Sequence, residues 1–146
     1  MTETHATHSE AETTALGCAL AARLRAGDVV LLAGPLGAGK TAFVRGLAEG
    51  LGAFPDDVAS PTFAIVHEYA GTTVMLRHVD LYRLAPAEAD DLGLDEMSTG
   101  AVMAVEWPDR WRDAPADAVR VRIESSGGDD RRVEIWTAPP FSHSTR

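Results

Sequence analysis

Residues 34–41 read GPLGAGKT, a spacing of glycines, one lysine and one threonine that suits the phosphates of a nucleotide. Glycines let backbone N–H groups approach phosphate oxygens, because no Cβ stands in the way. The Lys40 amine can reach the β- and γ-phosphates, and the Thr41 hydroxyl can bind Mg²⁺. Lys40 is the only lysine in the chain. The segment therefore predicts a phosphate-binding loop rather than an ordinary glycine-rich turn.

Two carboxylates stand at the ends of predicted strands. Glu106 follows the apolar run Ala101–Val105, and Asp80 ends the β-rich run Thr73–Val79. Either could be a surface carboxylate, but hydrolysis of a nucleotide needs acidic groups for Mg²⁺ and for water. Together with Lys40, they are the candidate catalytic residues.

Thr62 lies in Ser60-Pro61-Thr62-Phe63, between the loop and the first β-rich run. Its hydroxyl could sense the γ-phosphate, or the segment could be an ordinary Ser-Pro turn. Trp107, next to Glu106, has the residue type of a core side chain. The histidines lack the spacing of zinc ligands, so no zinc site is expected.

Four arginines lie in two predicted strands near the C-terminus. Arg120 and Arg122 share one face of the first strand, while Arg131 and Arg132 open the second. They could form a solvated face, or they could contact a partner or the nucleotide.

The residues around the loop indicate an α/β fold. Val29–Ala33 is a short apolar run typical of a buried strand, and residues 40–51 have helical spacing, which places the loop at a helix N-terminus where anions bind well. A capping box at Ser9 predicts a helix over Glu10–Arg25. Two hairpins (residues 62–79 and 119–136) and a short helix over Pro86–Gly93 complete a mixed sheet flanked by helices.

Composition narrows the class of protein. The chain has 146 residues, 45% of them hydrophobic, which predicts a single domain over 1–146 with frayed tails at 1–8 and 139–146. The net charge of −9 argues against free-standing, non-specific nucleic-acid binding, although an acidic subunit could dock on a basic partner. A single cysteine excludes an internal disulfide. No stretch is long enough to span a membrane, so a cytoplasmic protein is expected.

Four ordered motifs together carry a family resemblance: GPLGAGKT, SPTF from Ser60, HVDLYR from His78 and EWP from Glu106. This chain resembles the TsaE (YjeE) family over nearly its whole length. That family consists of small bacterial P-loop ATPases needed for the threonylcarbamoyladenosine modification of tRNA. Many members have Asp where Pro35 stands and Phe where Val79 stands. The first departure removes a side-chain carboxylate from a free position of the loop, and the second is conservative.

The resemblance implies a P-loop NTPase-like fold and a set of site residues. Mg²⁺ would be bound by Thr41 and Glu106, with Asp80 as the second required acid. Glu10 and Thr13 would line the base pocket, and Thr62 would lie in a switch segment. ATP phosphates would be bound by the loop residues Leu36, Gly37, Ala38, Gly39, Lys40 and Thr41.

The resemblance also implies a role as the ATP-hydrolysing subunit of a complex with a TsaD-type threonylcarbamoyl transferase and its TsaB-type companion. tRNA would be met only through that complex. Two alternatives remain open. One is a small-molecule or nucleoside kinase, although residues 84–101 lack the arginines of a kinase lid. The other is a nucleotide-gated binding module with negligible turnover.

Overall fold

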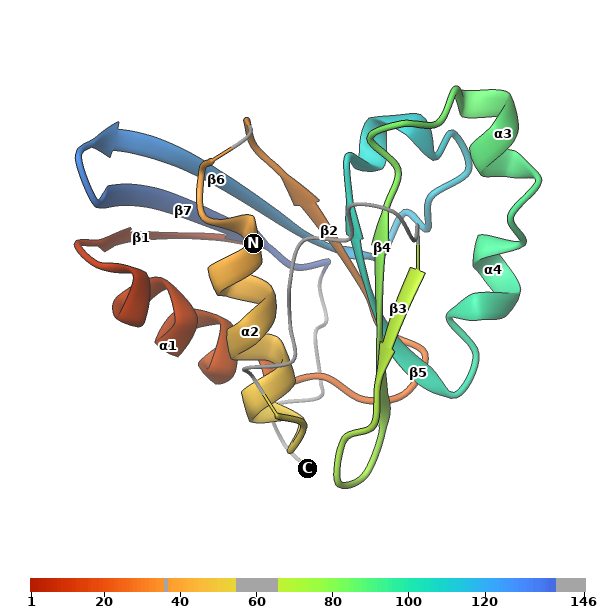
Figure 1. The fold of residues 1–146 in the computed structure, drawn as a ribbon, viewed down its shortest axis with the longest axis horizontal. Coiled ribbons are helices and arrows are strands. Elements are labelled where there is room, and N and C mark those ends of the chain that lie inside the picture. The colour runs from red at the N-terminus through yellow and green to blue at the C-terminus, as the bar shows by residue number, and fades with distance from the viewer. Residues whose placement is uncertain (36, 55–65, 139–146) are drawn as a thin grey trace.

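In the computed structural model, which describes residues 1–35, 37–54 and 66–138, one mixed sheet contains all seven described strands (Figure 1). Their spatial order is β1-β7-β6-β2-β5-β4-β3. The strands β2, β4, β5 and β6 run parallel where they adjoin, and β1–β7, β6–β7 and β3–β4 are antiparallel pairs. The bounds are β1 Thr2–Thr7, β2 Val29–Ala33, β3 Val66–Tyr69, β4 Met75–Asp80, β5 Ala101–Glu106, β6 Val119–Gly127 and β7 Asp130–Trp136. The predicted α/β class with antiparallel hairpins is confirmed.

Helices cover both faces of the central strands, which explains why β2 and β5 read as continuous apolar runs. On one face, α1 (Glu10–Ala21) and α2 (Lys40–Gly50) lie over the half of the sheet that contains β1, β7 and β6 (Figure 1). On the other, α3 (Pro86–Asp90), α4 (Leu94–Met97) and the 3₁₀ turn Pro108–Arg110 pack beside β4 and β5. Alternate residues of β2 divide between the two cores, Val30 and Leu32 in one, Val29 and Leu31 in the other.

The helices α1 and α2 approach so closely that glycine is required between them. A Cβ on Gly46 would lie 2.0 Å from the carbonyl oxygen of Thr14, and one on Gly17 would lie 2.3 Å from that of Phe43. The backbone cannot move aside as a flexible side chain would, so this contact between α1 and α2 excludes any side chain at Gly17 and Gly46. The close contact fixes α1 against α2, the helix that begins at the phosphate-binding loop.

Residues 2–7 form a strand, which corrects the expectation of a frayed N-terminal tail. β1 pairs along its length with β7, from Thr2 opposite Trp136 to Thr7 opposite Arg131. The sequence of β1, TETHAT, has no alternation of apolar and polar residues that would predict a strand. The strand forms because β7 offers an unpaired backbone edge.

Other expected boundaries also shift. The first helix ends at Ala21 rather than Arg25, and a second short helix, α4, follows α3 where one helix was expected. Residues 62–65 of the first hairpin and the tail 139–146 lie outside the described residues. Within the described part of the chain, no helix has the length and apolar character needed to cross a membrane.

Candidate active site

The loop that connects β2 to α2 has the backbone that its glycines allow. Gly34 leaves β2 so close to β6 that a Cβ would lie 2.3 Å from the carbonyl oxygen of Ile123. Gly39 has φ +106° at the N-terminus of α2, a conformation that L side chains rarely adopt. The helix begins at Lys40, so the first amides of α2 face the loop without partners of their own in the helix.

Beside this loop lies a cavity of about 300 Å³. Its lining brings together residues that are distant in the sequence. The loop and α2 contribute Lys40 and Thr41, and β5 contributes Glu106. The remaining walls come from Glu10 and Thr13 of α1, Arg45 of α2, and Asp129 and Arg131 of the β6–β7 hairpin.

Most of the expected site residues therefore meet at one place. Gly37 and Gly39 also line the cavity, and Ala38 is buried at 2% exposure beside them. Arg45 holds Glu10 at the wall through an ion pair of 2.7 Å between Nη1 and Oε1. Leu36 and Thr62 lie outside the described residues. Among the described residues Asp80 is not part of the lining, although it stands next to Glu106 in the sheet.

Lys40 crosses the site and is 5% exposed. Its Nζ donates a hydrogen bond of 2.7 Å to the carbonyl of Gly34 and lies 3.9 Å from Oε1 of Glu106. Burial lowers the pKa of this amine, while the charges of Glu106, Asp80 and Asp109 oppose that shift. A phosphate in the cavity would add a second anionic partner for this buried ammonium, so Lys40 favours binding of an anionic ligand.

Asp80 and Glu106 are direct neighbours in register at the ends of β4 and β5. Burial raises the pKa of the Asp80 carboxyl, and the Glu106 carboxylate raises it further. The backbone N–H of Tyr82, which donates to Asp80 Oδ1 at 2.9 Å, opposes the shift, as do His78 and Lys40. Both acids thus stand at the carboxyl edge of the parallel strands, as expected from their positions after apolar runs.

His78 is a site residue that sequence reasoning missed. Its side chain is fully buried, and Nε2 lies 2.5 Å from Oε2 of Glu106. Nδ1 is buried too and has no hydrogen-bond partner among the described residues. The sequence around His78 has no Cys or His at the spacing of zinc ligands and so does not indicate this contact. The available signal was its place two residues before Asp80, hence on the same side of β4.

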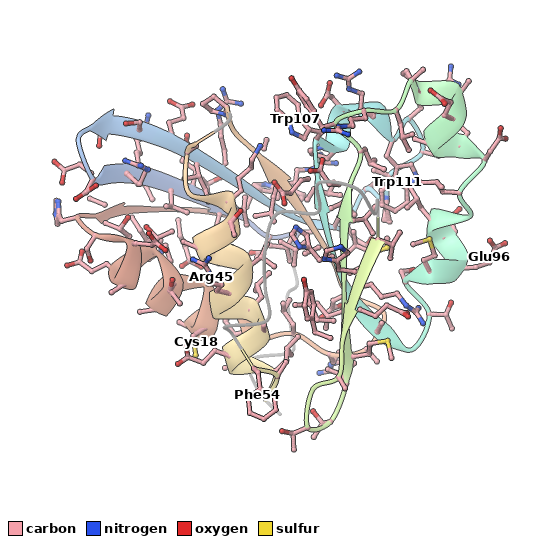
Figure 2. The ribbon with its side chains drawn as sticks, viewed as in Figure 1. Cys18, Arg45, Phe54, Glu96, Trp107 and Trp111 are labelled. Carbon is pink, nitrogen blue, oxygen red and sulfur yellow. The ribbon has the colours of Figure 1, made fainter. Side chains whose placement is uncertain are left out.

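Trp107 does more than fill the core. The Lys40 Nζ lies 4.4 Å from the centroid of its ring, within range of a cation–π contact, and the Tyr82 ring lies 4.9 Å from it on the same side of the fold. Figure 2 shows Trp107 at the end of the sheet where the β2–α2 loop emerges. Its φ of +58° is the only positive value of a non-glycine residue in the described part of the chain. A strained backbone here turns the chain sharply after Glu106.

The oxygen donors at the cavity suit Mg²⁺. The Thr41 hydroxyl and the Glu106 carboxylate line the same space, and Mg²⁺ prefers hard oxygen ligands from one or two carboxylates together with phosphates. In the ranges that the structure describes, no cluster of three or more His, Cys, Asp or Glu side chains could hold a metal by itself. An ion between Thr41 and Glu106 would have coordination positions open for phosphate oxygens.

Comparison with known proteins places this geometry in context. The sequence profile of a family described as "Threonylcarbamoyl adenosine biosynthesis protein TsaE" matches residues 7–133. The tRNA threonylcarbamoyladenosine biosynthesis protein TsaE of Streptomyces coelicolor is 47% identical over 119 residues, which cover 78% of this chain and 80% of that protein. The protein of the same name from Bacillus subtilis is 43% identical over 124 residues, covering 84% and 77%. The crystal structure of Bacillus subtilis YdiB superposes with a TM-score of 0.76 at 34% identity, covering 94% of this chain and 86% of that one.

Proposed function

The chain belongs to the TsaE family of tRNA threonylcarbamoyladenosine biosynthesis proteins, and from this premise we propose that it is the ATP-binding and ATP-hydrolysing subunit of the complex that installs threonylcarbamoyladenosine in tRNA. The observation that carries the proposal is the approach of Lys40 Nζ to within 3.9 Å of Glu106 Oε1 beside a glycine-rich loop. A cation for phosphates and a carboxylate for metal and water are the two elements that nucleotide hydrolysis requires.

In this proposal the loop amides and Lys40 bind the β- and γ-phosphates of ATP. Thr41 and Glu106 would hold Mg²⁺, which neutralises charge on the phosphates when it is bound. Glu106, with Asp80 beside it in the sheet as the second acid, orients a water molecule, which attacks the γ-phosphorus. The bond to the ADP oxygen then breaks, and inorganic phosphate leaves. Glu10 and Thr13, which line the same cavity from α1, would contact the base of the nucleotide.

The partners in this proposal are the TsaD-type transferase and its TsaB-type companion, and tRNA is met only through them. In this proposal residues 1–146 form one ATPase domain, which the single sheet through all the described strands supports, and the protein acts in the cytoplasm. Nucleotide governs docking through Thr62 and the segment Asp80–Arg83. Such coupling is reciprocal, so a partner that docks better on the ATP form also strengthens ATP binding by the same factor.

The central experiment measures phosphate release by the purified chain, alone and with the TsaB- and TsaD-type proteins, at saturating Mg²⁺. We expect slow release alone and faster release in the complex. Glu106→Gln is the control, and it should bind ATP but release no phosphate. No release in any mixture, with tight ATP binding, would instead identify a binding module. Phosphate transferred to an added acceptor would identify a kinase.

A second experiment tests the switch. Affinity for the partner proteins is measured without nucleotide, with ADP and with a non-hydrolysable ATP analogue. Thr62→Ala should reduce the difference among these three affinities more than it reduces ATP binding by the isolated chain. Equal affinities in all three states would refute the switch.

A further inference from the structure

We propose that Arg131 is a positioning residue for the phosphate-binding loop, which it holds from the neighbouring β6–β7 hairpin. The inference rests on the proposed function, because it takes the cavity beside the loop to be a phosphate site. Arg131 would maintain the shape of that loop, a role that the adjacent Arg132 does not share.

The guanidinium of Arg131 bridges the loop and the hairpin turn through backbone carbonyl groups. Nε donates to the carbonyl of Ala38 at 2.8 Å, and Nη2 donates to that of Gly37 at 3.4 Å. Nη1 donates to the carbonyls of Gly128 and Asp130 at 2.8 and 2.9 Å. One planar, rigid group with several donors can make such a bridge, and a lysine ammonium cannot span both segments.

Holding these carbonyls also orients amides of the loop. The Ala38 carbonyl and the Gly39 N–H belong to one planar peptide unit and point in opposite directions. An arginine that fixes the carbonyl therefore fixes the direction of the Gly39 N–H at the start of α2. A chain segment with this many glycines has great conformational freedom, and ordering it upon binding would cost affinity. Arg131 removes part of that freedom before a ligand arrives.

The charge of Arg131 also remains available to the site. Its side chain lines the cavity, and in the described part of the chain its bonded partners are neutral carbonyls rather than a carboxylate. By contrast, Lys40 faces Glu106 and Arg45 is paired with Glu10.

Arg132 supplies a matched control, because adjacent strand residues point to opposite faces. Arg131 is opposite Ser125 in register and shares a face with Val133, which is buried against the helices. Arg132 is opposite Glu124, is exposed, and lies 3.9 Å from the carboxylate of Glu134. Replacing either arginine by alanine removes the same charge from neighbouring positions, but only one replacement releases the loop.

The experiment compares Arg131→Ala, Arg131→Lys and Arg132→Ala with the unaltered protein. Calorimetry gives the affinity for ADP with Mg²⁺, and hydrogen exchange of the nucleotide-free protein gives the protection of amides in residues 34–41. We expect both Arg131 variants to lose about tenfold or more in ADP affinity, the size typical of lost hydrogen bonds to a charged group. Exchange in the loop should become faster in both, and Arg132→Ala should change neither quantity.

Two results would overturn the inference. Unchanged exchange in Arg131→Ala, in a protein that melts cooperatively, would show that the arginine does not hold the loop. Full recovery of ADP affinity in Arg131→Lys would show that charge alone matters. Failure of the unaltered protein to bind any nucleotide would refute the proposed function instead, and the exchange comparison would still decide the role of Arg131.

Discussion

The Nε2 atom of His78 lies 2.5 Å from Oε2 of Glu106, which leaves the other carboxylate oxygen of Glu106 on the side of Lys40. A carboxylate with one oxygen held by a buried imidazole has less freedom to rotate, so this contact sets the direction in which Glu106 would meet a metal ion or water.

Replacement of His78 tests this relationship. His78→Leu should lower phosphate release by about 10–100-fold, as is typical when the partner that orients a metal ligand is lost. His78→Gln keeps an N–H donor near the position of Nε2 and should recover part of the rate. ADP affinity measured without Mg²⁺ should change little in either variant, because His78 contacts the carboxylate rather than the loop. Equal rates in the two variants would indicate that His78 only fills space.

Lys40→Ala tests the phosphate site. It removes the buried amine, which donates to the Gly34 carbonyl and faces Glu106. A charge-assisted hydrogen bond from this amine to a phosphate contributes about 1.5–3 kcal/mol. We expect ATP affinity or phosphate release to fall roughly tenfold or more. Calorimetry and a phosphate-release assay together decide the matter, and unchanged values in both would remove Lys40 from the site.

Asp80→Asn should separate stability from activity. Burial raises the pKa of Asp80 above its ordinary value of 3.8, so the folded protein binds this proton more tightly than the unfolded chain does. The stability that this group contributes is therefore present below pH 3.8 and is lost as pH rises through the raised value. At pH 7, Asp80→Asn should melt a few degrees above the unaltered protein, with phosphate release abolished. Thermal melts from pH 3 to 8 check the sign, and a lower melting temperature at pH 7 would contradict it.

Trp107 should report nucleotide binding through its fluorescence. Its ring lies 4.4 Å from the Lys40 amine, so a phosphate that draws this amine away alters the environment of the indole. We expect ATP to change the emission of the unaltered protein. Trp107→Phe should abolish the change, whereas Trp136→Phe, in a strand away from Lys40, should preserve it. A signal that survives in Trp107→Phe would show that the amine does not leave the ring.

Gly46→Ala should destabilise the fold, although Gly46 itself does not line the cavity. The added methyl would lie 2.0 Å from the Thr14 carbonyl oxygen, so the two helices must separate. Overpacking of this kind costs about 1–3 kcal/mol, and sometimes more. Denaturant unfolding provides the measurement. Glu49→Ala, an exposed change on the same helix, should remain within about 0.5 kcal/mol of the unaltered protein.

The parts of this molecule that sequence could predict are those whose chemistry is local. The loop from Gly34 to Thr41 is contiguous, and apolar runs before Asp80 and Glu106 place both acids at one edge of a parallel sheet. Two features could not be predicted: the pairing of β1 with β7, and the contact of His78 with Glu106. Both depend on the order of the strands in the sheet, which the local sequence does not determine. For Arg131 and Arg132, the sequence predicts which face of the sheet each occupies but not what each contacts. The alternation that buries Val133 and Ile135 also places Arg131 on the helix-covered side, but only the register brings the loop within its reach.

The pairing of β1 with β7 bears on how the molecule is made. Thr2 leaves the ribosome long before Trp136 is synthesised, so β1 and the helix that follows it must wait for their final place in the sheet. The wall of the cavity formed by Glu10 and Thr13 faces residues of the hairpin that ends in β7. A nascent chain can thus carry its complete GPLGAGKT segment and still have no closed nucleotide cavity. The cavity can therefore close on this side only after the β6–β7 hairpin has been synthesised, well after the GPLGAGKT segment.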